Sequence, residues 1–211
     1  MNSYDKDLVV LVPDNNMSHT IMGILSRPES LNIRQLKYDI HIHVERDPGC
    51  FQSGHDFLRP MINRYKHGLL LFDKVGSGQE SKSREVLEQT AYERLKNSGW
   101  DNRAEVIILD PELEAWVWSD SPEVDRCLGW SGKEPNLRKW MRKEGLLPGG
   151  LVKPDNPKTS MEQALRHVKK IRSSAIYHQL AASVSFNRCT DPAFHKFKTT
   201  MFKWFGLNNK E

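Results

Sequence analysis

The sequence predicts an α/β protein with a mostly parallel, four-stranded sheet flanked by helices and a helical C-terminal extension. The main observation is that four strand-like segments alternate with helix-like segments through the first 120 of the 211 residues. This order is typical of parallel sheets whose strands are connected by helices. A second observation is that strand-like patterns stop after residue 120. We therefore expect an α/β domain over residues 1–120 and a basic helical region over residues 121–211 packed on it.

Three of the four predicted strands are continuous apolar runs. They are "DLVVLVPD" at 7–14, "GLLLFD" at 68–73 and "AEVIILD" at 104–110. Continuous runs of this length indicate strands that are buried on both faces. The remaining segment, "KYDIHIHVERDPGC", alternates apolar and polar residues and then reaches the turn-forming sequence "DPG". This alternation predicts a half-exposed strand, as at the edge of a sheet.

Helical spacing of apolar residues marks the connections between these strands. The segment "NNMSHTIMGILSRP" predicts a helix that stops near Pro28, and "HDFLRPMINRYKHG" (55–68) predicts one with Pro60 in its first turn. The third helix, "SREVLEQTAYERLKNSGW", is expected to bury one face. That face consists of Val86, Leu87, Ala91 and Leu95. A fourth helix is expected to begin at Pro111 in "PELEAWVWSD".

The C-terminal region reads as helices throughout. The segment "EPNLRKWMRKEGLLPGG" predicts a basic amphipathic helix, and "SMEQALRHVKKIRSSAIYHQLAASV" predicts a long helix or a helix pair. In that second segment, Ile171 and Ala175 are expected on the apolar side. The last helix, in "DPAFHKFKTTMFKWFG", is expected to bury an aromatic stripe.

Composition and charge limit the classes of protein to which this chain can belong. A hydrophobic fraction of 38% with 27% charged residues is ordinary for a soluble globular chain. No apolar run approaches the ~20 residues of a membrane helix, and the N-terminus lacks signal-peptide features. The three cysteines are widely spaced and indicate neither a disulfide framework nor a zinc site. We expect a cytoplasmic protein that does not contact a membrane.

The net charge of +4 is divided unevenly along the chain. Residues 1–130 carry a net charge of −6, and residues 131–211 carry +10. An acidic half that holds a metal and a basic half that holds phosphate is one interpretation. The alternative is a solvated surface whose charges happen to be uneven.

Acidic side chains follow all four predicted strands. The carboxyl ends of parallel strands are where ligands bind in such sheets. The acids at or just after the strand ends are Asp14, Asp47, Asp73, Asp110, Glu112 and Glu114. Asp73 is a candidate metal ligand, or else a residue that caps the turn "DKVGSG". Glu112 and Glu114 are candidates for a ligand or general base, or else first-turn acids favoured by the helix dipole.

Two further patterns have a chemical and a structural interpretation. His41, His43 and Glu45 alternate along one strand and could bind a transition metal or supply a base, but such alternation is also the polar face of an edge strand. The "GSG" at 76–78 could let a phosphate approach the backbone, although its spacing matches neither a P-loop nor a dinucleotide fingerprint. Helix capping by Ser77 and Ser81 is the simpler explanation.

Cations cluster at helical spacing in the basic region. Backbone phosphates of nucleic acid are their natural partner, and the acidic surface of another protein is the alternative. The residues predicted to contact nucleic acid are Arg138, Arg142, Arg166, Lys169 and Lys170.

Several of these segments together resemble one family. They are the acid near the end of the first strand, "FDKVGSG" after the third, "PELEAW" after the fourth and the closing "DPAFHKF". The chain resembles the small TOPRIM-like proteins of bacterial anti-phage defence loci, of the overcoming-lysogenization-defect and methylation-associated defence types. In TOPRIM enzymes a glutamate follows the first strand, and an Asp-x-Asp pair follows the third. Here Asp14 is the nearest acid to the first position, and Asp73 matches the pair while Val75 replaces its second aspartate.

The resemblance implies a component of a prokaryotic defence system that binds or cleaves nucleic acid with Mg²⁺, or Mn²⁺. A phosphodiesterase of this kind would use Asp73, Glu112 and Asp14 for catalysis and Asp73, Glu112 and Glu114 as metal ligands. The alternative is a catalytically degenerate scaffold subunit that binds a partner defence protein, with an ATPase among the candidates. A third possibility is a nucleotide sensor that uses the "GSG" turn.

Overall fold

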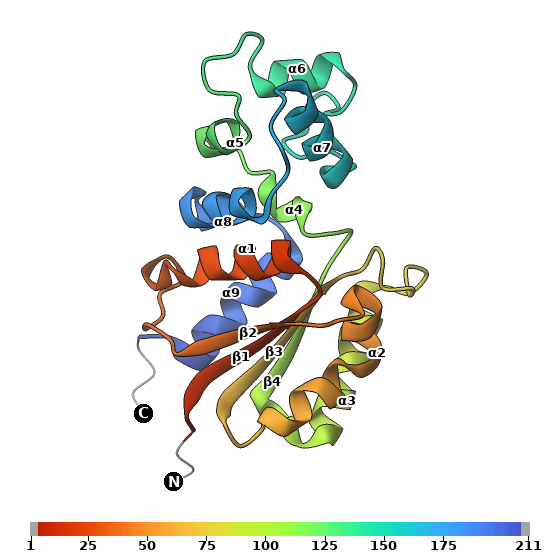
Figure 1. Cartoon of the computed structure of the whole chain (residues 1–211), viewed down its shortest axis with the longest axis vertical. Helices are drawn as coiled ribbons and strands as arrows, with labels where there is room; N and C mark the ends of the chain where they lie inside the picture. The colour runs from red at the N-terminus through yellow and green to blue at the C-terminus, as the bar shows by residue number, and fades with distance from the viewer. Residues whose placement is uncertain (1–3, 208–211) are drawn as a thin grey trace.

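A computed structural model describes residues 4–207 and has the predicted α/β architecture (Figure 1). Its sheet contains the strands β1 (Lys6–Val12), β2 (Tyr38–Ile42), β3 (Tyr65–Asp73) and β4 (Ala104–Leu109). They lie in the order β2-β1-β3-β4, and every neighbouring pair is parallel. The prediction of a four-stranded parallel sheet with β2 at an edge is confirmed.

The three apolar strands are buried on both faces, as their sequences indicate. Val10 and Leu71 belong to one hydrophobic core, which continues into the C-terminal helices. Their neighbours along the strands, Leu11 and Leu70, belong to a second core under the helices of the opposite face. Alternate residues of a strand point to opposite sides of the sheet, so a continuous apolar run supplies both cores.

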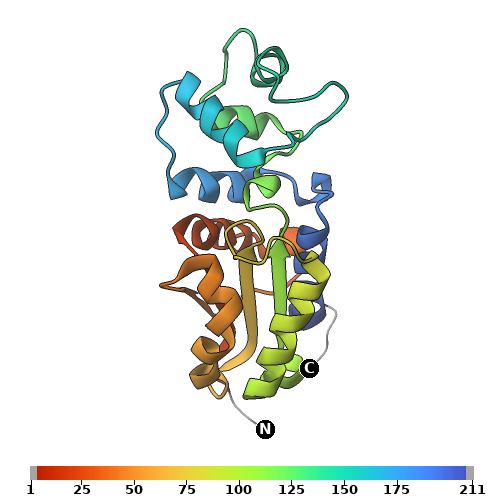
Figure 2. The ribbon, with the colours of Figure 1, turned by 90° about the vertical axis from the view of Figure 1, so that its right-hand side faces the viewer.

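Helices cover both faces of the sheet (Figures 1 and 2). The helices α1 (Asn15–Leu25) and α9 (Pro192–Phe205) lie on one face, and α2 (Arg46–Leu58) and α3 (Arg84–Leu95) lie on the other. The chain leaves β1 toward the first face and β3 toward the second. The boundary between β1 and β3 is therefore the topological switch point, where ligands bind in open parallel sheets.

The second helix begins earlier than predicted. A helix was expected over 55–68, but α2 spans Arg46–Leu58 and a short helical turn follows at Arg59–Met61. Pro48 lies in the first turn of α2, where its missing N–H is not needed, so "DPG" starts a helix instead of closing a strand. Pro60 lies beyond the end of α2, because a proline cannot continue the backbone hydrogen-bond ladder.

The helices of the C-terminal region that precede α9 lie at the end of the molecule away from the termini, while α9 runs back along the sheet (Figure 1). Helix α8 (Ser174–Ser183) of this region packs closely on α1 at Gly23, where an added Cβ would lie 2.6 Å from the carbonyl oxygen of His178. Within residues 4–207, no helix is both long and apolar enough to cross a membrane. The helices of this region before α9 are α4 (Glu114–Val117), α5 (Pro122–Cys127), α6 (Leu137–Lys143), α7 (Pro157–His167) and α8 (Ser174–Ser183). Shorter helical turns lie at Pro28–Leu31, Lys96–Trp100, Asp101–Arg103 and Phe186–Arg188.

Three residues predicted to face the core are exposed instead. Val86 is half-exposed on α3, and Ile171 and Ala175 are exposed around the start of α8. The segment predicted as a long helix or a pair is a pair, because α7 ends at His167 and α8 starts at Ser174. The helical period does not continue across this break, so the expected inward positions of Ile171 and Ala175 were wrong.

Candidate functional site

Acidic side chains from all four strand ends gather around the carboxyl end of the sheet. We call Asp14, Asp47, Asp73, Glu112 and Glu114 the acidic edge. Asp14 follows β1, Asp73 ends β3, and these two strands are neighbours at the switch point. The predicted position of the acids is therefore confirmed by the order of the strands. Asp110 instead lies exposed and pairs with Lys74 at 2.9 Å.

Asp73 is the most strongly perturbed of these acids. Its Oδ1 atom has no solvent contact and no hydrogen-bond partner among the residues that the structure describes, although the residue as a whole is partly exposed. Burial raises the pKa of Asp73 well above the ordinary value, and the negative charges of Asp47, Glu114 and Asp14 raise it further. Asp73 does not cap the "DKVGSG" turn, because Glu80 accepts the amides of Gly76 and Gly78.

Asp47 connects the ends of β2 and β3. It lies in the first turn of α2, and its Oδ1 accepts the backbone N–H of Asp73 at 2.8 Å. Burial raises the pKa of Asp47, and the nearby Asp14 carboxylate acts in the same direction. The sequence had indicated a place for Asp47 near this edge, and the structure puts it beside Asp73.

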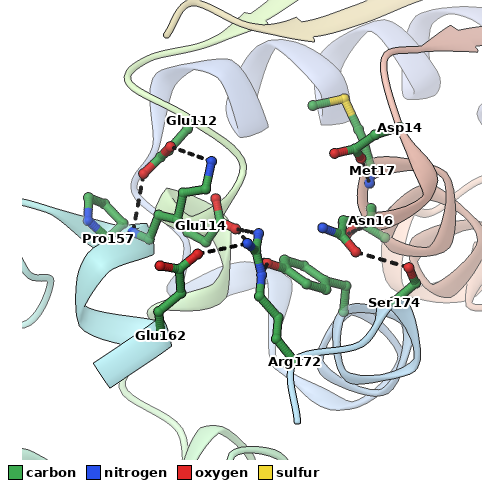
Figure 3. A network of polar contacts seen from close by, with 12 residues as sticks. Asp14, Asn16, Met17, Glu112, Glu114, Pro157, Glu162, Arg172 and Ser174 are labelled. Carbon is green, nitrogen blue, oxygen red and sulfur yellow. Dashed lines mark hydrogen bonds and ion pairs between the residues drawn. The ribbon is translucent and has the colours of Figure 1, made fainter. Parts of the chain in front are cut away.

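The two glutamates after β4 are paired with cations from the C-terminal region (Figure 3). Glu114 is almost fully buried and accepts from Arg172 Nη2 at 2.5 Å and from the Tyr177 hydroxyl at 2.5 Å. Glu112 accepts the backbone N–H of Lys158 at 3.2 Å, and the Lys158 ammonium lies 3.5 Å away. Burial raises the pKa of Glu112, and the adjacent Glu114 charge adds to this rise.

Asp14 serves a structural role as the N-cap of α1. Its Oδ1 accepts the backbone N–H of Met17 at 2.9 Å, which satisfies one of the free donors at the start of a helix. In Figure 3, Asp14 lies beside α1, while Glu112 and Glu114 lie on the opposite side next to α7. Asp14 and Glu112, two of the three predicted catalytic acids, thus lie on different sides of the edge (Figure 3).

The acidic edge does not match a preformed metal site. Across residues 4–207, no three histidine, cysteine, aspartate or glutamate side chains form a group that could hold a metal ion. Among the described residues, the predicted ligands Asp73, Glu112 and Glu114 do not form such a group. Glu112 and Glu114 are instead paired with Lys158 and Arg172.

The histidine pattern has a packing role. The strand β2 ends at Ile42, so residues 41–45 do not share one strand face. His43 is buried; its Nδ1 accepts the backbone N–H of Glu45, and its Nε2 lies 3.1 Å from the Ser53 hydroxyl. These contacts fix the start of α2 and leave His43 no free ring nitrogen for a metal.

The five predicted nucleic-acid contacts divide into two groups. Arg138 donates to the carbonyls of Ser119 and Val152, both at 2.6 Å, and burial lowers its pKa. Lys170 donates to the carbonyl of Cys127 at 2.6 Å. Both side chains hold loops together. The other three, Arg142, Arg166 and Lys169, are exposed.

These three residues belong to a larger group of exposed cations on α6, the segment before it and the end of α7. None of these side chains makes a hydrogen bond or ion pair within the described part of the chain. We call this group the basic surface, and it consists of Lys133, Lys139, Arg142, Lys143, Arg166 and Lys169. An aromatic cluster joins its two helices, because Trp140 of α6 packs on His167 of α7 at 4.8 Å between ring centres.

Comparison with known proteins supplies no further identification. No protein-family model matches the chain, no curated protein matches it, and no solved structure matches it. The TOPRIM-like resemblance therefore stays a prediction carried by the residues themselves.

Proposed function

We propose that this chain binds nucleic acid through its basic surface, as a TOPRIM-like subunit of a prokaryotic defence system. The observation that carries the proposal is a set of exposed cations on and next to α6 and α7 that have no partner within residues 4–207. Cations that are free of internal partners are available to displace counterions from phosphates, and this displacement supplies most non-specific nucleic-acid affinity. Arg142, Arg166 and Lys169 are the predicted contacts that remain in this role.

The arrangement favours binding over cleavage. Helix α7 starts at the acidic edge, where Lys158 pairs with Glu112, and ends at the basic surface with Arg166. Its 11 residues correspond to about 16 Å at 1.5 Å per residue. A phosphate backbone held at Arg166 is therefore about one helix length from Glu112. Glu112 and Glu114 are committed to internal cations.

The test is a titration of a labelled duplex and a labelled single strand at several salt concentrations, followed by fluorescence anisotropy. Wild-type protein should bind with an affinity that falls linearly with the logarithm of salt concentration. The variant Arg142→Gln/Arg166→Gln/Lys169→Gln should lower the slope for duplex DNA by up to ~2.7, because each lost phosphate contact removes ~0.9. A matched control removes three exposed cations from elsewhere on the chain, Lys37→Gln/Lys82→Gln/Lys96→Gln.

Equal effects of the two triple variants would contradict the proposal. Absence of any binding at low salt would also overturn it and would favour the scaffold alternative. In that alternative the basic surface contacts the acidic surface of a partner defence protein, which includes the possibility of an ATPase. The same two triple variants then show whether the partner protein binds the basic surface or another part of the chain, because only in the first case does the basic-surface variant weaken the complex.

A second candidate function is metal-dependent cleavage at the acidic edge. One observation favours it: the Oδ1 atom of Asp73 is buried near four other carboxylates and has no hydrogen-bond partner within residues 4–207. Isothermal titration with Mg²⁺ and Mn²⁺ tests this candidate independently of nucleic acid. Millimolar or tighter binding that Asp73→Asn abolishes, together with cleavage lost in the same variant, would establish it. Nucleic-acid binding with no heat of metal binding would leave only the first proposal.

A further inference from the structure

The two edges of the sheet are protected very differently. At the β4 edge, the Ile108 amide donates to Glu88 Oε1 at 3.0 Å, and Lys196 Nζ donates to the Val106 carbonyl at 2.7 Å. Lys196 also pairs with Glu88 Oε2 at 3.0 Å. Charged side chains therefore occupy the outward backbone groups of β4, and this arrangement prevents another strand from adding there.

The β2 edge has no such protection. The Lys37 carbonyl accepts the Asp7 amide at 2.8 Å, and the His43 amide donates to the Val12 carbonyl at 2.9 Å. The backbone N–H and C=O groups of the odd-numbered residues along β2 therefore point toward β1. Alternation along a parallel ladder then turns the N–H and C=O groups of Tyr38, Ile40 and Ile42 outward. Within residues 4–207, no hydrogen bond to these six backbone groups is found.

We propose that β2 pairs with β2 of a second copy of this chain, antiparallel and about a two-fold axis at Ile40. The pairing joins two four-stranded sheets into one continuous sheet. In this register Tyr38 lies opposite Ile42, and Asp39 lies opposite His41. Two-fold symmetry repeats each of these pairs, as an isologous interface requires.

The chemistry of the paired side chains favours a second copy as the occupant. An aromatic residue opposite a β-branched residue, and an acid opposite an imidazole, are both favourable cross-strand pairs. Lys6 and the Tyr65 hydroxyl hold the Asp39 carboxylate in place at the edge. Ile42 is 39% exposed, which is unusual for an isoleucine in a strand. In the proposed pair, Tyr38 of the second copy covers the Ile42 side chain and lowers its exposure.

The length of β2 bounds the strength of the dimer. The strand has only five residues, so pairing of two β2 strands buries a small area. Stable protein interfaces bury about 1,200–2,000 Å². We therefore expect a dimer that dissociates on dilution. Neither the acidic edge nor the basic surface includes a residue of β2, so this inference is independent of the proposed function.

Disulfide trapping tests the register. Ile40→Cys places two thiols on the axis, where opposite Cα atoms of an antiparallel pair are about 5.5 Å apart. A disulfide spans this distance. Ile42→Cys is the matched control, because its two copies would be roughly 14 Å apart at ~3.4 Å per residue. The native cysteines are buried and free, so wild-type protein should not cross-link.

The expected result is a covalent dimer for Ile40→Cys under mild oxidation, reversed by reductant, with little dimer for Ile42→Cys. A folded Ile40→Cys protein that stays monomeric would overturn the proposal, as would equal cross-linking of the two variants. Wild-type protein gives a second readout if the substitution disturbs folding. Amides of Tyr38, Ile40 and Ile42 should be protected from hydrogen exchange at high concentration and should lose this protection on dilution. Fast exchange at every concentration would overturn the dimer.

Discussion

Removal of the Arg172 side chain tests whether one buried ion pair joins the helical region to the sheet. Arg172 is 29% exposed in its side chain and reaches Glu114, whose side chain is only 2% exposed. It also pairs with Glu162 at 2.9 Å and donates to the Tyr177 hydroxyl at 2.7 Å. In Arg172→Met the alkyl volume is largely kept, while the Glu114 carboxylate loses its only charged partner among the described residues.

The magnitude follows from the burial of the two groups. Breaking a buried pair by removing one partner costs about 3–5 kcal/mol. Because Arg172 is partly exposed and the Tyr177 hydroxyl still donates to Glu114, we expect about 2–3 kcal/mol. For a chain of this size, 1 kcal/mol corresponds to about 2–4 °C in Tm, so the melting temperature should fall by about 4–12 °C.

Differential scanning calorimetry and urea denaturation at neutral pH measure this loss. The control is Arg142→Met, which removes an exposed arginine and should change stability by less than about 0.5 kcal/mol. Adding Glu114→Gln to Arg172→Met should restore part of the lost stability, because the unpaired buried charge disappears. If Arg172→Met melts within 1–2 °C of the control (about 0.5 kcal/mol or less on the same scale), the pair does not hold the two regions together.

Three further predictions concern other parts of the molecule. Asp73→Asn should be more stable than wild type at pH 7.5 but not at pH 4. The folded-state pKa of Asp73 lies well above its ordinary value of 3.8, so the wild type loses stability as the pH rises from 3.8 through the folded-state pKa. Urea melts at both pH values check this, and a less stable variant at pH 7.5 contradicts it. Gly23→Ala should lower Tm by pushing α8 away from α1, because the new Cβ would lie 2.6 Å from the His178 carbonyl oxygen; a higher Tm, as in an open helix, would show that the contact relaxes freely. Lys196→Met should expose the β4 edge and speed aggregation in a light-scattering assay. Lys198→Gln, at a partly exposed lysine of the same helix that does not contact β4, serves as the comparison, and equal rates would mean that Lys196 does not protect the edge.

Local sequence patterns determined most of the sheet. Three apolar runs and one alternating run predicted the four strands close to their observed bounds. A strand buried on both faces needs a continuous run of apolar residues, and a strand buried on one face needs alternating apolar and polar residues. The same logic put Asp14, Asp47 and Asp73 near one edge, since the carboxyl ends of parallel strands meet there. The start of α2 was misplaced because "DPG" suits both a turn and the first turn of a helix.

The tertiary structure alone decided what these acids contact. Arg172 lies 58 residues after Glu114, and Lys158 lies 46 residues after Glu112, so no local pattern links them. Likewise, Arg138 and Arg142 are one helical turn apart, yet Arg138 is partly buried and donates to backbone carbonyls, while Arg142 is exposed. Charge and spacing indicate which side chains can pair, but which pairs form depends on how distant segments pack. That packing neutralises the glutamates of the acidic edge and leaves the cations of the basic surface free.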